Sequence, residues 1–221
     1  MKWYEKAAAQ GNAKAQDRLG RLADLPTLRT QATQGDARAQ LQLGGLYATG
    51  EGVPQDYAIA RQCYEKAAAQ GDALAQTSLG VLYANGRGVP QDYTKARQWY
   101  EKAAAQGEAG AQYNLGELYH DGQGVPQDYA KAREWFMKAA AQGEAQAQHN
   151  LGVMYVYGRS VPKNYVRAYM WESLAAARLT GVQQRFAAEN RDEIARRMTP
   201  AQIAEAQRLS QLCQTRQFKG C

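Results

Sequence analysis

Few residues in this chain could do chemistry, and their surroundings do not favour catalysis. Ser160 and Lys163 form an S-x-x-K sequence, the pattern that carries the serine nucleophile of β-lactamases and penicillin-binding proteins. No SDN or KTG sequence accompanies it, and it stands in a segment predicted to be a loop rather than at the start of a helix. We therefore expect no β-lactamase chemistry from Ser160.

The two histidines, His120 and His149, are the other candidates. Neither has a cysteine, a histidine or a carboxylate at the spacing of a zinc motif. The sequence also lacks a P-loop and the G-x-G-x-x-G pattern of dinucleotide-binding proteins. We therefore predict no catalytic residue, no metal site and no cofactor, and so no enzyme.

Two of the three cysteines stand close together in the sequence. Cys213 and Cys221 lie in the C-terminal segment CQTRQFKGC, where a short loop could join them. A disulfide requires their Cα atoms to approach to about 5.5 Å, and it persists only in an oxidising compartment. The sequence leaves open whether they are bonded, and whether the protein is periplasmic or cytoplasmic.

The elements that position these residues come from a repeated sequence. The unit GDAxAQxxLGxLYxxGxGVPQDYxKAxxWYxKAAAQ begins at Gly35, Gly71, Gly107 and Gly143, a step of 36 residues. Repeats of this length are typical of solenoids, in which each small unit buries its apolar face only against its neighbours.

Each unit contains two segments with helical periodicity. In the second copy the predicted helices cover residues 72–85 and 92–106, with apolar residues three to four positions apart. The segment between them holds two glycines and a proline, so it cannot be helical throughout. Gly80 falls inside the first helix, where glycine costs about 1 kcal/mol relative to alanine. We interpret it and its copies as places where a neighbouring helix approaches closely; the copies are Gly44, Gly116 and Gly152.

The run AQxxLGxLYxxGxGVPxDYxKAxxWYxKAA resembles the Sel-one-like repeat, a relative of the tetratricopeptide repeat. The resemblance implies an all-α fold, a right-handed α-solenoid of helix-loop-helix repeats whose first helices line the concave face. It also implies a non-catalytic adaptor or scaffold that binds a protein or peptide. The alternative is an immunity protein that binds a cognate bacterial effector, a role that some members of the family hold.

We predict one solenoid over residues 1–221. Residues 1–34 are degenerate repeats, 35–178 hold the four regular repeats, and 179–221 form capping helices and a tail. A deletion of 12 residues near Pro26 leaves a short helix predicted over residues 26–34, and its effect on the solenoid is open. The fourth repeat departs from the pattern in its second helix, which we interpret as the drift of a terminal repeat.

The charge of the chain is concentrated near its C-terminal end. The net charge is +6, and residues 159–221 hold 11 basic and 5 acidic residues, which accounts for all of it. We interpret this as a solvated face; a docking surface for an acidic partner or a membrane is the alternative. No nucleic-acid motif and no apolar run long enough to span a membrane are present. We expect a monomer.

The resemblance to tetratricopeptide repeats also implies which positions face the groove. In the first two repeats these positions hold mostly small or apolar residues, whereas in the last two they hold aromatic, acidic and imidazole side chains. Such a surface suits a peptide with an apolar anchor and a basic or hydrogen-bonding group. The predicted partner-binding residues are Tyr113, Glu117, His120, Asp121, His149 and Tyr157. The alternative is that they are solvated and have no dedicated partner.

Overall fold

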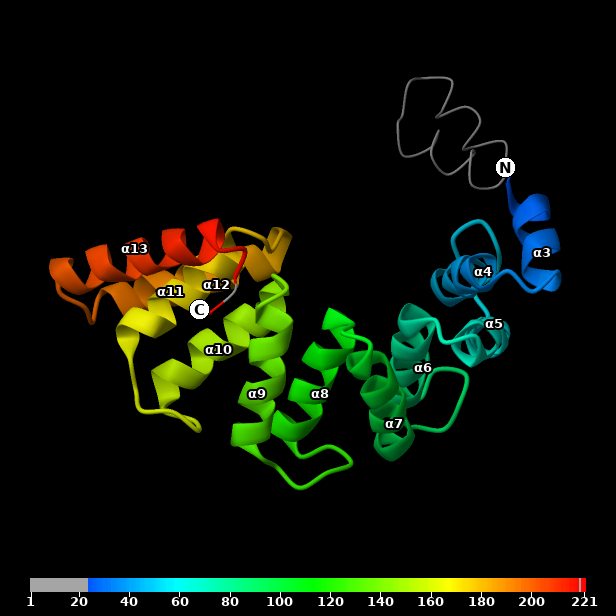
Figure 1. Ribbon diagram of the computed structural model, residues 1–221, viewed down its shortest axis with the longest axis horizontal. Helices are drawn as coiled ribbons and strands as arrows, with labels where there is room; N and C mark the ends of the chain where they lie inside the picture. Colours follow the sequence, from blue (N-terminus) through cyan, green and yellow to red (C-terminus); the bar gives the residue numbers. More distant parts are fainter. Residues whose placement is uncertain (1–23, 219) are drawn as a thin grey trace, which may run out of the picture. The chain divides into compact units, whose positions relative to one another are not determined.

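The computed structural model describes residues 24–218 and 220–221, which contain helices and no strand (Figure 1). The chain divides into two compact units, residues 1–103 and 104–221. The described helices of unit 1 are α3 (Leu25–Thr33), α4 (Ala37–Thr49), α5 (Tyr57–Ala69) and α6 (Ala73–Asn85), and α7 (Tyr93–Ala105) reaches the boundary. Unit 2 holds α8 (Ala109–Asp121), α9 (Tyr129–Ala140), α10 (Ala145–Tyr157), α11 (Tyr165–Ala176), α12 (Gly181–Ala195) and α13 (Pro200–Thr215).

The predicted all-helical fold of repeated helix pairs is confirmed. We call the first helix of each regular repeat the A helix (α4, α6, α8 and α10) and the second the B helix (α5, α7, α9 and α11). Helix α3 begins at Leu25 with Pro26 in its first turn, as expected. Residues 1–23 of the predicted degenerate repeats lie outside the described residues. That one solenoid spans residues 1–221 stays a prediction.

The ends of the A helices follow from two recurring residue types. An acidic side chain before each A helix accepts a hydrogen bond from a backbone N–H of the first turn, which caps the helix. These residues are Asp36, Asp72, Glu108 and Glu144. A glycine in the left-handed conformation ends each A helix. These glycines are Gly50, Gly86, Gly122 and Gly158. The repeated acidic residue and glycine therefore set the length of each A helix.

At Gln70 and Gln142, the glutamine of the AAAQ segment joins the end of the repeat to the start of the same repeat. Gln142 Nε2 donates to the carbonyl oxygen of Gly107 at 2.8 Å and to Gln112 Oε1 at 2.9 Å. Gln70 makes the equivalent two hydrogen bonds in unit 1, each 2.9 Å long. These bonds satisfy polar groups at helix ends that have no partner within their own helix. This glutamine therefore links the two ends of a repeat, whereas the bond of Gln148 Nε2 to the carbonyl oxygen of Ala140 crosses to the preceding repeat.

The glycine inside each A helix lies against the B helix of the same repeat. A Cβ atom at Gly116 would overlap the ring of Phe136, and the glycines of the first two repeats face tyrosine rings in the same way. Those pairs are Gly44–Tyr64 and Gly80–Tyr100. The prediction that these glycines mark close helix contacts is confirmed. In the fourth repeat Gly152 faces a carboxylate instead, because Glu172 occupies the position of the ring.

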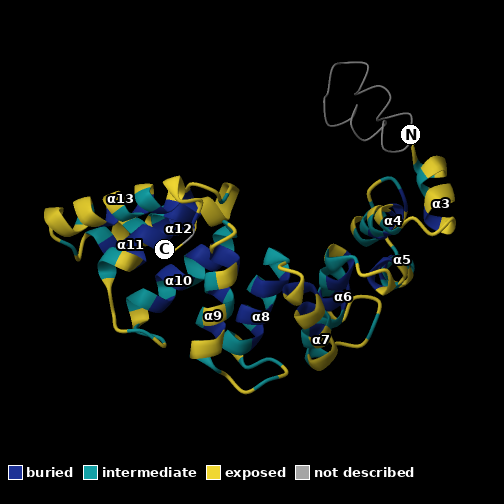
Figure 2. Cartoon of the chain, viewed as in Figure 1, coloured by how far each residue is buried: buried dark blue, intermediate teal, exposed yellow. Residues whose placement is uncertain are grey.

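Helix α11 lies at the centre of unit 2. Helices α10, α12 and α13 all pack against it, and most of its residues are buried, including Trp171 and Glu172 (Figure 2). Helix α13 begins with a capping box between Thr199 and Gln202, with Pro200 in its first turn.

Candidate functional site

Helix α12 takes the place of a further A helix beside α10. Gln184 Nε2 donates to the carbonyl oxygen of Ala176 at 3.2 Å, as Gln148 Nε2 does to that of Ala140 at 3.3 Å. Gln184 follows Gln148 by 36 residues. The register of the repeats therefore continues into α12, and α8, α10 and α12 border a common surface of unit 2.

Two hollows lie on this surface. The first hollow, of about 340 Å³, is lined by Tyr113, Gln146, His149, Asn150, Leu179, Gln183, Phe186 and Asn190. The second, of about 290 Å³, is lined by Val153, Val156, Tyr157, Tyr165, Glu172, Asn190, Glu193, Ile194 and Arg197. Asn190 lines both, so the two hollows are neighbours along α12. Of the predicted binding residues, Tyr113 and His149 line the first and Tyr157 lines the second.

Tyr113, Glu117 and Asn150 form a hydrogen-bonded group beside the first hollow. The Tyr113 hydroxyl is bonded to the Glu117 carboxylate, which also accepts a bond of 2.5 Å from Asn150 Nδ2. Burial raises the pKa of Glu117, and the two hydrogen bonds act in the opposite direction. Burial also raises the pKa of Tyr113, with a contribution from the charge of Glu117. Tyr113 is therefore a neutral hydrogen-bonding side chain at neutral pH.

His149, Glu172 and Asn190 form a second polar group, between the two hollows. The Glu172 carboxylate is fully buried; its Oε2 accepts from His149 Nδ1 at 2.9 Å, and its Oε1 from Asn190 Nδ2 at 3.4 Å. The hydrogen bond to Glu172 raises the pKa of His149, and burial opposes that shift. Burial raises the pKa of Glu172 despite the imidazole. A charged or hydrogen-bonding group thus lies within an otherwise apolar helix contact.

His120 and Asp121 do not line either hollow. His120 Nδ1 donates to Asp121 Oδ1 at 2.7 Å, and His120 Nε2 accepts from the guanidinium of Arg159 at 2.9 Å. The imidazole also makes an edge contact with the ring of Tyr129, with 5.2 Å between the centroids. These contacts hold His120 at the end of α8. Of the six predicted binding residues, Tyr113, His149 and Tyr157 thus line the hollows and Glu117 lies beside the first. His120 and Asp121 form a separate pair.

Several residues of the hollows were not among the predicted set, chiefly because α12 lies outside the regular repeats. Phe186 lines the first hollow with 58% of its surface exposed. Glu172 is the exception, because a signal for it exists in the sequence: it stands 36 residues after Phe136 and 72 after Tyr100, at a position that is otherwise aromatic.

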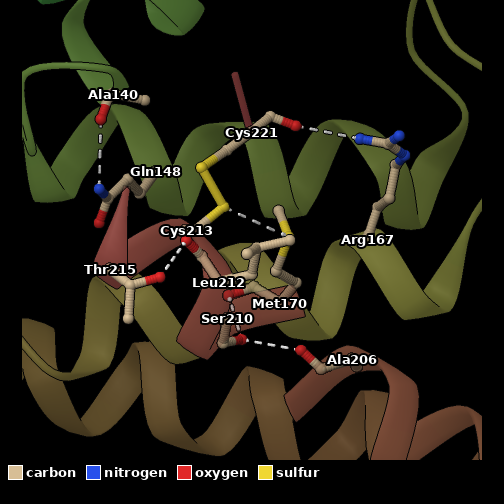
Figure 3. Close-up of a disulfide and its surroundings, with 10 residues drawn as sticks. All are labelled: Ala140, Gln148, Arg167, Met170, Ala206, Ser210, Leu212, Cys213, Thr215 and Cys221. Carbon is tan, nitrogen blue, oxygen red and sulfur yellow. Dashed lines mark hydrogen bonds between the residues drawn. A yellow bond between two sulfur atoms is a disulfide. The ribbon is translucent and has the colours of Figure 1, made fainter. Parts of the chain in front are cut away.

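The C-terminal tail is joined to α13 by a disulfide between Cys213 and Cys221, whose Cα atoms are 5.6 Å apart (Figure 3). Cys213 Sγ lies 4.0 Å from the sulfur of Met170, and the backbone oxygen of Cys221 accepts from Arg167 at 3.2 Å. Phe218 is buried in the core of unit 2. The tail is therefore held against α11 by covalent, polar and apolar contacts.

Ser160 and Lys163 line neither hollow, whereas Glu193 and Arg197 of the capping helices line the second. Ser160 and Lys163 are exposed in the loop after α10. In the capping helices Arg196 and Arg197 both pair with Glu193, within 3.1 Å. No group of three or more possible metal ligands occurs among the described residues. None of the described helices is long and apolar enough to cross a membrane.

Thirty-six-residue helix pairs joined by glutamine hydrogen bonds define this chain as an α-helical repeat protein. A family model for the Sel1 repeat matches residues 1–12, 37–72, 73–108, 109–144 and 145–178, and the chain belongs to this family. Sel1 repeat proteins generally act as protein-interaction scaffolds, and their solenoid fold is typically non-catalytic.

Two solved structures support this assignment. A Sel1 repeat protein from Oxalobacter formigenes is 32% identical, with coverage of 84% of this chain and 71% of that chain and a TM-score of 0.67. A protective antigen with an SLR fold, present in uropathogenic Escherichia coli strains, is 28% identical, with coverage of 96% of this chain and 62% of that chain and a TM-score of 0.51. A comparison with curated proteins gave no match.

Proposed function

We propose that this chain is a non-catalytic adaptor that binds a peptide segment of a partner protein along the surface bordered by α8, α10 and α12. We take this surface to be the concave face that the resemblance to the family implies. The observation that supports the proposal most directly is the pair of adjoining hollows, which together border three successive A-type helices. An extended or helical segment can follow such a line of hollows and place alternate side chains in them.

The walls of the first hollow suit an apolar anchor residue. Leu179 and Phe186 supply apolar surface, while His149, Asn150 and Gln146 supply hydrogen-bonding groups around it. Aromatic side chains that are exposed beside polar groups are characteristic of binding hot spots. Phe186 therefore combines large exposed area with a fixed place on a helix.

The test is a selection of random peptides displayed on phage against the purified full chain, followed by measurement of Kd for the selected peptides. We expect Phe186→Ala and Tyr157→Ala each to weaken binding about tenfold or more, because each change removes apolar contact area worth roughly 1.5–3 kcal/mol when fully buried. Both side chains are mainly exposed, at 58% and 63% of their surface, so the fold should tolerate the changes.

Val182→Ala is the matched control. Val182 lies on α12 one turn before Phe186, is 54% exposed and lines neither hollow. Peptides whose affinity responds to Phe186 but not to Val182 would support the site. Peptides that bind all variants equally would contradict it. Nothing in the described residues favours the immunity alternative, in which a single cognate effector is bound.

A further inference from the structure

His149, Glu172 and Asn190 form a polar group. The equivalent positions one repeat earlier hold aromatic or apolar residues. His149 and Glu172 follow Tyr113 and Phe136 by 36 residues, and Asn190 follows Met154 by the same step. The rings of Tyr113 and Phe136 are in contact, with 5.9 Å between their centroids, and Met154 is buried. At all three positions the later set therefore has a hydrogen-bonding residue where the earlier set has an aromatic or apolar one.

The fold does not require this exchange. The three preceding repeats bury an aromatic ring against the A-helix glycine, and a buried carboxylate is costly unless it is paired and hydrogen-bonded. Replacing a buried ionic group with well-packed apolar residues is often neutral or stabilising in other proteins. A chain that had only to close its solenoid could therefore keep a phenylalanine at position 172. The carboxylate calls for a reason beyond packing.

The placement of Glu172 supplies that reason. Glu172 is one of the residues that line the second hollow, together with Val153, Ile194 and Tyr157. Oε2 is engaged by His149, whereas Oε1 has only the 3.4 Å bond from Asn190. A carboxylate oxygen can accept two hydrogen bonds, so Oε1, with one long bond, is the less satisfied oxygen of this buried carboxylate.

The second hollow already contains one cation at its edge. Arg197 lines it but is bonded to Glu193 at 3.1 Å and to Tyr165. Its charge is therefore balanced by a neighbouring carboxylate, and Glu172 is not its partner. Tyr157, which lines the same hollow, is 63% exposed, and the guanidinium carbon of Arg159 lies 5.5 Å from the centroid of its ring. A carboxylate next to an aromatic face is a favourable environment for an organic cation.

We propose that the second hollow binds the ammonium or guanidinium group of a lysine or arginine side chain on the partner segment, with Glu172 as its counter-ion. This inference rests on the proposed function and adds a specificity: an apolar residue enters the first hollow and a basic residue the second. His149 and Asn190 position the carboxylate, and Tyr157 covers the flank of the bound side chain.

The experiment measures Kd for peptides selected on the wild type and for the same peptides with glutamine in place of each basic residue. Each peptide is tested on the wild type and on Glu172→Gln. We expect selected peptides to be enriched in lysine or arginine and to bind Glu172→Gln about tenfold or more weakly, the usual scale for a charge-assisted hydrogen bond. The peptides with glutamine should bind the wild type and Glu172→Gln equally, because they have no basic group to pair with Glu172.

A second variant guards against misfolding of the first. His149→Tyr/Glu172→Phe copies the Tyr113–Phe136 pair of the preceding repeat, and we expect it to fold, by circular dichroism and thermal melting, and to lose the preference for basic peptides. Peptides that depend on Phe186 but retain their affinity for both Glu172 variants would overturn the inference and leave the proposed function standing. Peptides whose affinity also does not change in Phe186→Ala would overturn both the inference and the proposed function.

Discussion

Gly44 and Tyr64 are in such close contact that no side chain fits between them: a Cβ atom at Gly44 would lie 2.6 Å from Cε1 of the tyrosine ring. The next residue, Gly45, faces away, and the nearest atom to a Cβ there is the Tyr64 hydroxyl oxygen at 3.9 Å. Two adjacent glycines of one helix thus have different physical roles.

We predict opposite effects of alanine at these two positions. Gly44→Ala should lower the free energy of unfolding by about 1–3 kcal/mol, because the added methyl group must displace a buried ring. Gly45→Ala should raise it by up to about 1 kcal/mol, because alanine favours the helix and nothing opposes it. Urea unfolding of both variants tests this, and a stabilising effect at Gly44 would contradict the packing role.

Ser160 provides a second test of backbone conformation. It has a φ of 63°, in the left-handed region, at the position where the third repeat has Gly124 with a φ of 68°. A side chain in this region costs roughly 1 kcal/mol. We expect Ser160→Gly to raise the thermal midpoint and Gly124→Ser, the reverse exchange, to lower it. If neither variant moves the midpoint, the loops do not limit stability.

The pH dependence of stability should reflect His149 and Glu172. The pKa of each is raised in the folded state, from 6.5 for His149 and 4.5 for Glu172. A raised pKa contributes stability below the unfolded value, and this contribution is lost as pH rises through the folded value. Stability should therefore fall as pH rises above 6.5 through His149, and as it rises above 4.5 through Glu172.

The control for this prediction is His149→Tyr/Glu172→Phe, which lacks both groups and keeps His120, the other histidine. Urea unfolding across this pH range should show the wild type losing stability relative to the variant. The charges that face His149 are Glu172 on α11 and Glu117 on α8. Parallel curves for the two proteins would exclude titration of the pair as the cause.

The disulfide predicts a defined pattern of thiol labelling. Alkylation of the unfolded protein without reductant should modify Cys63 alone, and prior reduction should make all three cysteines reactive. Cys213→Ser/Cys221→Ser should lose about 2–3 kcal/mol of stability relative to the oxidised chain, because the bond closes a loop between residues eight apart. Intact mass measures the labelling, and three modified cysteines before reduction would contradict the bond.

The repeat itself could be predicted from the sequence because its determinants are local. Helix caps, loop glycines and the 36-residue spacing act within or between adjacent segments, so the helices were found close to their observed bounds. The internal comparison of repeats also identified Gly116 as a close contact, because glycine inside a helix needs a packing reason.

The composition of the candidate site was decided by tertiary structure. The same comparison found Tyr113, His149 and Tyr157, but it could not place Phe186 or Asn190, since α12 lacks the regular pattern and its position depends on how it packs against α11. Glu172 was visible as a departure from the repeat, yet its sequence position alone indicated only drift. Its meaning depends on contacts with His149 and Asn190, which are 23 and 18 residues away in the chain, and these form only when three helices pack together.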